Sequence, residues 1–190
     1  MTRNNVDHQA LQPIEWVKEG SLDSLCPPLS LLPLLLEKGL LTARIQQRCK
    51  RSFQLEVLGA GEAGSHWLDH YQNWAPCSGK RREIVMWCDG RPGMYAETVI
   101  PDATANAQPW IRSLGTQPLG ERLQLMEGVT RSAFEYARID ASEIVPSSWL
   151  GESLAPAVLW ARRSAFYIQQ DPLWVIEVFL SAVTTPAQEA

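Results

Sequence analysis

Two hydrophobic patterns divide the chain. Between residues 22 and 47 the apolar positions recur at helical spacing, with Pro27 and Pro28 near a helix start and Gly39 as a break. Further along, apolar and polar positions alternate or form short apolar runs, which is typical of strands. The runs that predict strands are residues 54–58, 83–88, 94–100, 132–139, 159–169 and 173–182.

Turn residues between these runs predict hairpins. Asp89 and Gly90 stand between the second and third runs, and Asp-Gly between apolar segments is a strong hairpin signal. Pro101 should end the third strand, because proline cannot continue a strand ladder. A second hairpin is expected around residues 170–172.

The connections complete a coarse plan of the chain. Residues 117–126 read as a helix, and residues 61–80, rich in Gly, Trp, Ser and Asn, read as a long loop. Helices come first and antiparallel strands follow without a βαβ alternation, so the expected fold class is α+β. With 190 residues we expect a single domain over the whole chain, with loose tails at about 1–12 and 184–190.

Composition and charge exclude several classes of protein. The formal net charge is −4, whereas a nucleic-acid binder usually shows a basic surplus. The first ten residues lack the apolar segment of an export signal, and the most apolar run, residues 29–36, is too short to span a bilayer. We therefore expect no membrane span and no nucleic-acid partner. A cytoplasmic location and a monomeric state are further expectations.

The cysteines and histidines predict no metal site. Cys26, Cys49, Cys77 and Cys88 are scattered without a CxxC pair, and the three histidines complete no zinc pattern. Reduced thiols suit a cytoplasmic protein, and a chain of this size needs no disulfide to hold its core. The Gly-rich run at 58–64 lacks the helix that follows a nucleotide-binding turn, so we expect no cofactor.

Two charged residues lie on strands that should be buried. Side chains alternate across a strand, so Arg82 shares the face of Ile84 and Met86. Glu177 lies within a strand that is apolar on both faces and should be central in its sheet, where a lone carboxylate is costly. Two accounts stay open. Either Glu177 pairs with Arg82 or with backbone groups, or both residues line a closed cavity for a small anionic ligand.

Arg162 and Arg163 pose a similar question on the strand predicted at 159–169. Adjacent residues point to opposite faces of a strand, so one of the two arginines should face inward. The alternative is one solvated arginine and one surface salt bridge. Residue types alone do not decide which arginine is buried.

Several short motifs occur in an order that resembles a known family. They are Arg82-Glu83-Ile84 leading to Cys88-Asp89-Gly90, Thr98-Val99-Ile100-Pro101, Leu114-Gly115-Thr116-Gln117-Pro118-Leu119-Gly120, Thr130-Arg131, Leu159-Trp160-Ala161-Arg162-Arg163-Ser164 and Glu177-Val178-Phe179-Leu180. Together they resemble the chorismate pyruvate-lyases of bacterial ubiquinone biosynthesis. The resemblance implies a compact α+β fold with an antiparallel sheet of about six strands and a ligand buried beneath helical flaps. It also implies a cofactor-free elimination that converts chorismate to 4-hydroxybenzoate and pyruvate.

The resemblance assigns roles to four positions. Arg82 matches the arginine that binds the substrate carboxylate, and Leu119 matches a leucine that contacts the ligand. Glu177 matches a buried glutamate, and Leu41, which precedes Thr42, matches a contact from the N-terminal helical region. Arg82 and Glu177 are therefore the catalytic candidates, and Glu177 either binds the ring hydroxyl or acts as a general acid.

A second function belongs to another class. Effector-binding domains of some transcription regulators are similar in fold, so the chain could be a non-enzymatic domain that binds a small aromatic carboxylate. Such regulators usually carry a DNA-binding helix-turn-helix ahead of the sensor, and the residues before the first clear hairpin lack a basic recognition helix. The lyase is therefore the leading interpretation.

Overall fold

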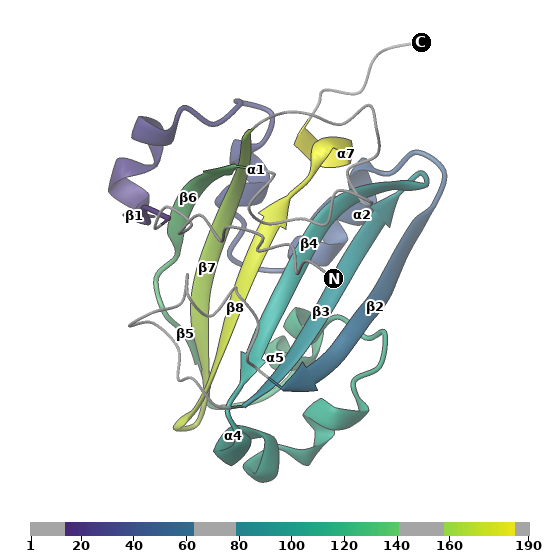
Figure 1. Cartoon of the computed structure of the whole chain (residues 1–190), viewed down its shortest axis with the longest axis vertical. Coiled ribbons are helices and arrows are strands. Elements are labelled where there is room, and N and C mark those ends of the chain that lie inside the picture. The colour runs from purple at the N-terminus through teal and green to yellow at the C-terminus, as the bar shows by residue number, and fades with distance from the viewer. Residues whose placement is uncertain (1–13, 63–78, 141–157, 185–190) are drawn as a thin grey trace, which may run out of the picture.

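The computed structural model describes residues 14–62, 79–140 and 158–184. Within them the chain forms one open sheet of eight strands in the order β1-β6-β7-β8-β4-β3-β2, with β5 beside β7 (Figure 1). All paired strands are antiparallel. The long strands are β2 (Phe53–Glu62), β3 (Lys80–Cys88), β4 (Arg91–Ile100), β6 (Glu135–Asp140), β7 (Val158–Ile168) and β8 (Asp171–Phe179), and the short ones are β1 (Val17–Lys18) and β5 (Val129–Arg131). The expected α+β class and antiparallel sheet are confirmed.

Short helices connect and cover the strands. They are η1 (Glu19–Leu25), α1 (Leu32–Leu35), α2 (Leu41–Arg48), α4 (Asp102–Ala107), η2 (Pro109–Ser113), α5 (Leu119–Gln124) and α7 (Ser181–Thr184). Figure 1 places α1, α2 and α5 on one side of the sheet. No helix in the described ranges is both long and apolar enough to cross a membrane.

The helical pattern at 22–47 forms three short segments, η1, α1 and α2. Prolines restrict the backbone between η1 and α1, and Gly39 lies in the break between α1 and α2, as predicted. The helix expected at 117–126 is confirmed as α5. Thr184 of the expected C-terminal tail belongs to α7, and the rest of both tails lies outside the described residues.

Both predicted hairpins are confirmed, but their boundaries differ from the expectation. Asp89 and Gly90 form the first turn with φ of 54° and 77°, the left-handed region that this turn requires. The second turn falls at 169–170 rather than 170–172, because proline is tolerated at the start of a strand and Pro172 joins β8. The loop expected at 61–80 is shorter at both ends, since β2 runs to Glu62 and β3 begins at Lys80.

The strand that carries Glu177 is central, as predicted, because β8 lies between β7 and β4. One face of β8 packs Ile176 and Val178 against residues of β3, β4, β6 and β7. The other face packs Val175 and Phe179 into clusters that include α1, α2 and α5. Because side chains alternate along a strand, Glu177 lies on the face that these helices cover.

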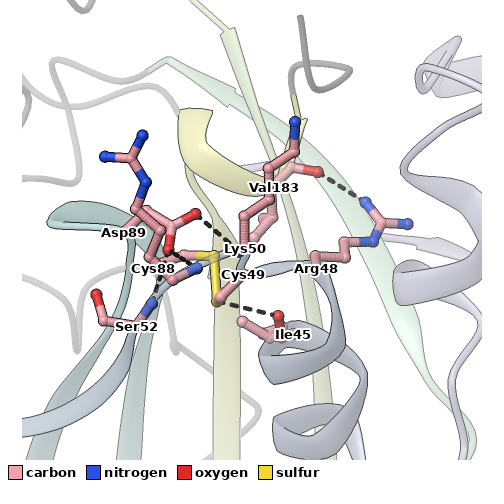
Figure 2. Close-up of a disulfide and its surroundings, with 9 residues drawn as sticks. Ile45, Arg48, Cys49, Lys50, Ser52, Cys88, Asp89 and Val183 are labelled. Atoms are coloured by element: carbon pink, nitrogen blue, oxygen red, sulfur yellow. Dashed lines mark hydrogen bonds between the residues drawn. A yellow bond between two sulfur atoms is a disulfide. The ribbon is translucent and has the colours of Figure 1, made fainter. Parts of the chain in front are cut away.

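A disulfide joins Cys49, which follows α2, to Cys88 at the end of β3 (Figure 2). The two Cα atoms are 5.1 Å apart, although the cysteines are separated by 39 positions in the sequence. The expectation of reduced thiols is therefore wrong for these two residues, whereas Cys26 is a free, exposed cysteine. Spacing alone does not reveal the pair, because the fold brings together two positions that are distant in the chain.

The carboxylate of Asp89 fixes the same corner of the molecule (Figure 2). It accepts hydrogen bonds from the backbone N–H groups of Ser52, Lys50 and Arg51 at 2.7 to 2.9 Å. These hydrogen bonds hold the pKa of Asp89 below its ordinary value. The first hairpin turn is thereby tied to the segment that links α2 to β2.

Replacing both Cys49 and Cys88 by alanine should lower the free energy of unfolding by about 2–4 kcal/mol, because the bridge restricts the unfolded chain over a long loop. Denaturant unfolding without reductant measures this change. The matched control is Cys26→Ala, which should leave the unfolding midpoint unchanged. Equal midpoints for the double variant and the control would contradict the bridge.

A buried carboxylate cluster lies on the sheet face opposite to Glu177. Glu97 of β4 is only 1% exposed. The hydroxyl oxygen of Tyr95 lies 2.6 Å from Glu83 Oε1 and 3.3 Å from Glu97 Oε2. Burial, reinforced by the negative charge of Glu83, raises the pKa of Glu97 to about 7, against the opposing effects of Arg81 and the Tyr95 hydrogen bond.

Glu97 should make stability depend on pH near neutrality. Its folded-state pKa is raised, so its stabilising contribution is fully present below about pH 4.5 and is lost as the pH rises through about 7. Wild type should lose on the order of 2 kcal/mol through this group between about pH 5.5 and about pH 8. Glu97→Gln should flatten this dependence in thermal melts, whereas the exposed control Glu127→Gln should keep it. An unchanged slope in Glu97→Gln would show that Glu97 is ionised throughout.

Candidate active site

A cavity of about 230 Å³ lies between the sheet and the starts of α2 and α5. Its walls come from strands β3, β4, β5, β7 and β8 and from the two helix starts. All four residues singled out from the sequence line it: Leu41, Arg82, Leu119 and Glu177. The fold therefore gathers side chains that are up to 136 positions apart, from Leu41 to Glu177, around one space.

The sheet register explains why the charged residues meet here. Ala96, Glu177 and Arg162 lie opposite one another on β4, β8 and β7. Arg82 lies in the adjacent row, opposite Thr98. Ala96 lines the cavity, and its small side chain leaves space above the sheet between Arg82 and Glu177.

Arg82 is buried, with 8% of its surface exposed. Its Nη2 donates hydrogen bonds to the carbonyl oxygens of Gly115 at 2.9 Å and Gln117 at 3.2 Å. Burial lowers the pKa of Arg82, but an arginine stays protonated in proteins near neutral pH. Arg82 thus presents a positive charge at the cavity and holds the turn that precedes α5.

Glu177 does not pair with Arg82. Its Oε2 accepts a hydrogen bond from Arg162 Nε at 2.6 Å and lies 3.6 Å from Arg131 Nη2. Burial alone raises the pKa of Glu177, but the charges of Arg162 and Arg131 and the hydrogen bond from Arg162 outweigh burial and lower it. The open possibility of an Arg82–Glu177 ion pair is therefore wrong, and Glu177 is a carboxylate at neutral pH.

Arg162 is the inward-facing member of its pair, with 0% of its surface exposed. Its Nη1 donates to the carbonyl oxygens of Leu34, Leu35 and Glu37 at 3.0, 3.0 and 2.6 Å. These carbonyls lie at and just after the end of α1, where helix carbonyls lack partners within the helix. Arg162 therefore joins the helical layer to Glu177 on the sheet.

Arg163 points to the other face of β7. Its Nη2 lies 2.8 Å from Glu135 Oε2, and its guanidinium packs over the ring of Trp16 at 4.3 Å. The prediction that one arginine faces inward is confirmed. The alternative was one solvated arginine and one surface salt bridge. Only its salt bridge is found, between Arg163 and Glu135.

Arg131 also lines the cavity, although the sequence did not predict it as a site residue. Its Nε donates to Ser164 Oγ at 2.8 Å, and its guanidinium packs over Phe134 at 4.0 Å and Phe166 at 4.4 Å. Burial and the charge of Arg162 lower the pKa of Arg131 to about 10 against the opposing effect of Glu177, so it remains charged at neutral pH. The sequence signal was the Thr130-Arg131 motif, which carried no assigned role.

Leu41 and Leu119 stand at equivalent places in the helical layer. Each is the first residue of its helix, α2 or α5, and neither helix start has a side-chain cap. Both leucines are buried, with 6% and 8% of their surfaces exposed. They close the apolar side of the cavity and bring uncapped backbone N–H groups to its edge.

Comparisons with known proteins point to one family. The model of a family described as chorismate lyase matches residues 10–188. A probable chorismate pyruvate-lyase of Thiobacillus denitrificans is 32% identical, over 97% of this chain and 98% of that protein. Another, from Ralstonia nicotianae, is 36% identical over 75% of this chain and 77% of that protein.

Solved structures show a related fold at low sequence identity. PhnF from Mycobacterium smegmatis has a TM-score of 0.52 and 16% identity, and the match covers 79% of this chain and 67% of PhnF. The effector domain of PhnF from the same organism has a TM-score of 0.50 and 15% identity, and the match covers 77% of this chain and 91% of that domain. At this identity the likeness concerns the fold alone.

Glu177→Gln should lower the free energy of unfolding by about 1–3 kcal/mol, because it leaves the buried charge of Arg162 without its counter-ion while the amide keeps one hydrogen-bond acceptor. Thermal and denaturant unfolding measure the change. The control is Glu135→Gln, which removes the partner of Arg163 in a more exposed pair and should cost less than about 1 kcal/mol. Equal losses of unfolding free energy in both variants would mean that the buried Arg162–Glu177 pair stabilises the fold no more than the exposed Arg163–Glu135 pair.

Proposed function

Because this chain belongs to the chorismate lyase family, we propose that it eliminates pyruvate from chorismate to give 4-hydroxybenzoate. We further propose that it does so without metal or nucleotide cofactor, as a cytoplasmic monomer, and that the product serves ubiquinone biosynthesis. The observation that carries the proposal is a cavity that both Arg82 and Glu177 line. Its volume of about 230 Å³ is below the usual range for drug-sized ligands and suits a compound with one ring.

Arg82 is the proposed partner of the ring carboxylate. A guanidinium offers a planar fork of donors that matches a planar carboxylate, and this arginine is held in place by its bonds to Gly115 and Gln117. The backbone N–H groups of Leu41 and Leu119 are further donors for the same ligand. Burial strengthens each of these contacts, since water does not compete for the donors.

Glu177 is the proposed partner of the ring hydroxyl. Of the two roles left open by the sequence, its lowered pKa favours a hydrogen-bond acceptor over a general acid, because an ionised carboxylate has no proton to give. Accepting the hydroxyl hydrogen fixes the carbon atom whose hydrogen is lost when the ring becomes aromatic. Arg162 holds the carboxylate in that orientation through its 2.6 Å hydrogen bond.

The elimination needs little chemistry from the protein. The ring–oxygen bond to the enolpyruvyl group breaks, its electrons leave with the oxygen, and the proton from the hydroxyl-bearing carbon ends on the departing group as it becomes pyruvate. Aromatisation supplies the driving force. The chain orients the ring between Arg82 and Glu177 and excludes water with the starts of α2 and α5.

The non-enzymatic sensor is not favoured. Its support is the likeness to the effector domain of PhnF, which at 15% identity concerns the fold alone. The curated relatives that cover nearly the whole chain are named probable lyases. A sensor would bind 4-hydroxybenzoate without consuming chorismate, so turnover separates the two functions.

Purified protein should convert chorismate to 4-hydroxybenzoate and pyruvate after exhaustive dialysis against EDTA.

Arg82→Lys should weaken 4-hydroxybenzoate binding by about 10–100-fold, because the charge stays but the fork geometry is lost. The matched control is Arg81→Lys on the opposite face of β3, which should bind like wild type. Calorimetry measures the affinities. Lost activity that a metal restores would contradict cofactor independence, and unchanged product affinity in Arg82→Lys would contradict the role of Arg82.

A further inference from the structure

Chorismate carries a second carboxylate, on its enolpyruvyl group, which Arg82 and Glu177 do not engage. We propose that Arg131 binds this second carboxylate and so makes the cavity specific for a dianionic substrate. The proposal rests on the proposed function and extends it to the departing half of the molecule.

The charge balance of the cavity supports a dianion. The charged residues that line it with at most 18% of their side chains exposed are Arg82, Arg131, Arg162 and Glu177. Three positive charges and one negative charge leave an excess of two positive charges. Buried charge without a counter-ion is costly, and a ligand with two carboxylates removes the excess.

Glu177 does not need Arg131 as a hydrogen-bonded counter-ion. Glu177 already has a hydrogen bond of 2.6 Å from Arg162, whose side chain is fully buried. Arg131 Nη2 lies 3.6 Å from the same carboxylate oxygen, which is beyond hydrogen-bond distance. A purely structural counter-ion for Glu177 is therefore already present in Arg162.

The surroundings of Arg131 prepare its outer edge for a carboxylate. Phe134 and Phe166 pack against the guanidinium, and Ser164 takes the Nε hydrogen. These contacts fix the plane of the group and leave the edge formed by the two Nη atoms as its hydrogen-bonding end. A guanidinium held in this way binds a carboxylate with two parallel hydrogen bonds and loses little side-chain entropy.

Arg162 contributes charge to the same subsite. Its Nε and Nη1 are used by Glu177 and by the carbonyls after α1, while its Nη2 is buried and has no hydrogen-bond partner among the described residues. An unsatisfied buried donor on a cavity residue is unusual in a folded protein. It adds to the positive potential at the end of the cavity where Arg131 lies.

A matched pair of unreactive ligands tests the subsite. The lactyl ether and the isopropyl ether of 4-hydroxybenzoate differ only by a carboxylate in place of a methyl group. Wild type should bind the lactyl ether about 10–100-fold more tightly than the isopropyl ether. Arg131→Gln should abolish this preference while its affinity for 4-hydroxybenzoate stays within about threefold of wild type.

Kinetics and controls separate a binding role from a structural one. With chorismate, Arg131→Gln should lower kcat/KM by about 100-fold, and Arg131→Lys should recover part of that loss because it restores the charge. Arg163→Gln removes an equal charge from the other face of β7 and should keep the preference for the lactyl ether. If Arg131→Gln fails to fold, the preference of wild type and of Arg131→Lys still decides the question.

The outcomes distinguish the subsite from the function on which it rests. No preference for the lactyl ether in wild type, or a full preference retained in Arg131→Gln, would overturn the subsite even if chorismate is consumed. Equal weakening of all three ligands in Arg131→Gln would also overturn it, because Arg131 would then only support the fold of the cavity. Failure of wild type to consume chorismate would refute the lyase function, while the ether pair would still report on the subsite.

Discussion

The hydrogen-bonded ion pair between Arg162 and Glu177 is the constraint on which the rest of the site depends. Arg162 is fully buried, so its charge must be satisfied by protein groups, and three backbone carbonyls of the α1 end do so together with Glu177. One side chain thereby fixes the helical layer above the sheet and the orientation of the carboxylate on the sheet. A buried ion pair seldom adds net stability compared with apolar packing, which is consistent with a pair kept for the cavity it organises.

The same pair sets the electrostatic character of the cavity. Arg162 and Arg131 lower the pKa of Glu177 against the effect of burial. The charged residues that line the cavity with little exposure are therefore one carboxylate and three arginines. Such a site favours an anionic ligand and places an acceptor where a hydroxyl would lie. On the opposite face of the sheet, Glu97 shows the contrary balance, since burial and a neighbouring carboxylate raise its pKa to about 7. Two glutamates on adjacent strands thus differ in ionisation. The charges of Arg162 and Arg131 outweigh burial at Glu177, whereas burial and Glu83 outweigh Arg81 at Glu97.

The sequence predicted the parts of the site that are encoded locally. Strand alternation placed Arg82 and Glu177 on covered faces, Asp-Gly marked the first hairpin, and the family motifs brought Leu41 and Leu119 to the same cavity. It did not identify the partners of Glu177, because Arg162 is a cross-strand neighbour on β7 and Arg131 comes from the short strand β5. The disulfide was missed for the same reason, since pairing across the fold is not visible in spacing.

Infrared difference spectroscopy on Glu177 tests the central claim most directly. The spectrum of wild type minus that of Glu177→Gln isolates the carboxyl signal of this residue near neutral pH. The account predicts only the bands of an ionised carboxylate, both in the free protein and with 4-hydroxybenzoate bound, because Arg162 and Arg131 remain beside it. A band from a protonated carboxyl group in the free protein would contradict the account and would restore Glu177 as a candidate general acid.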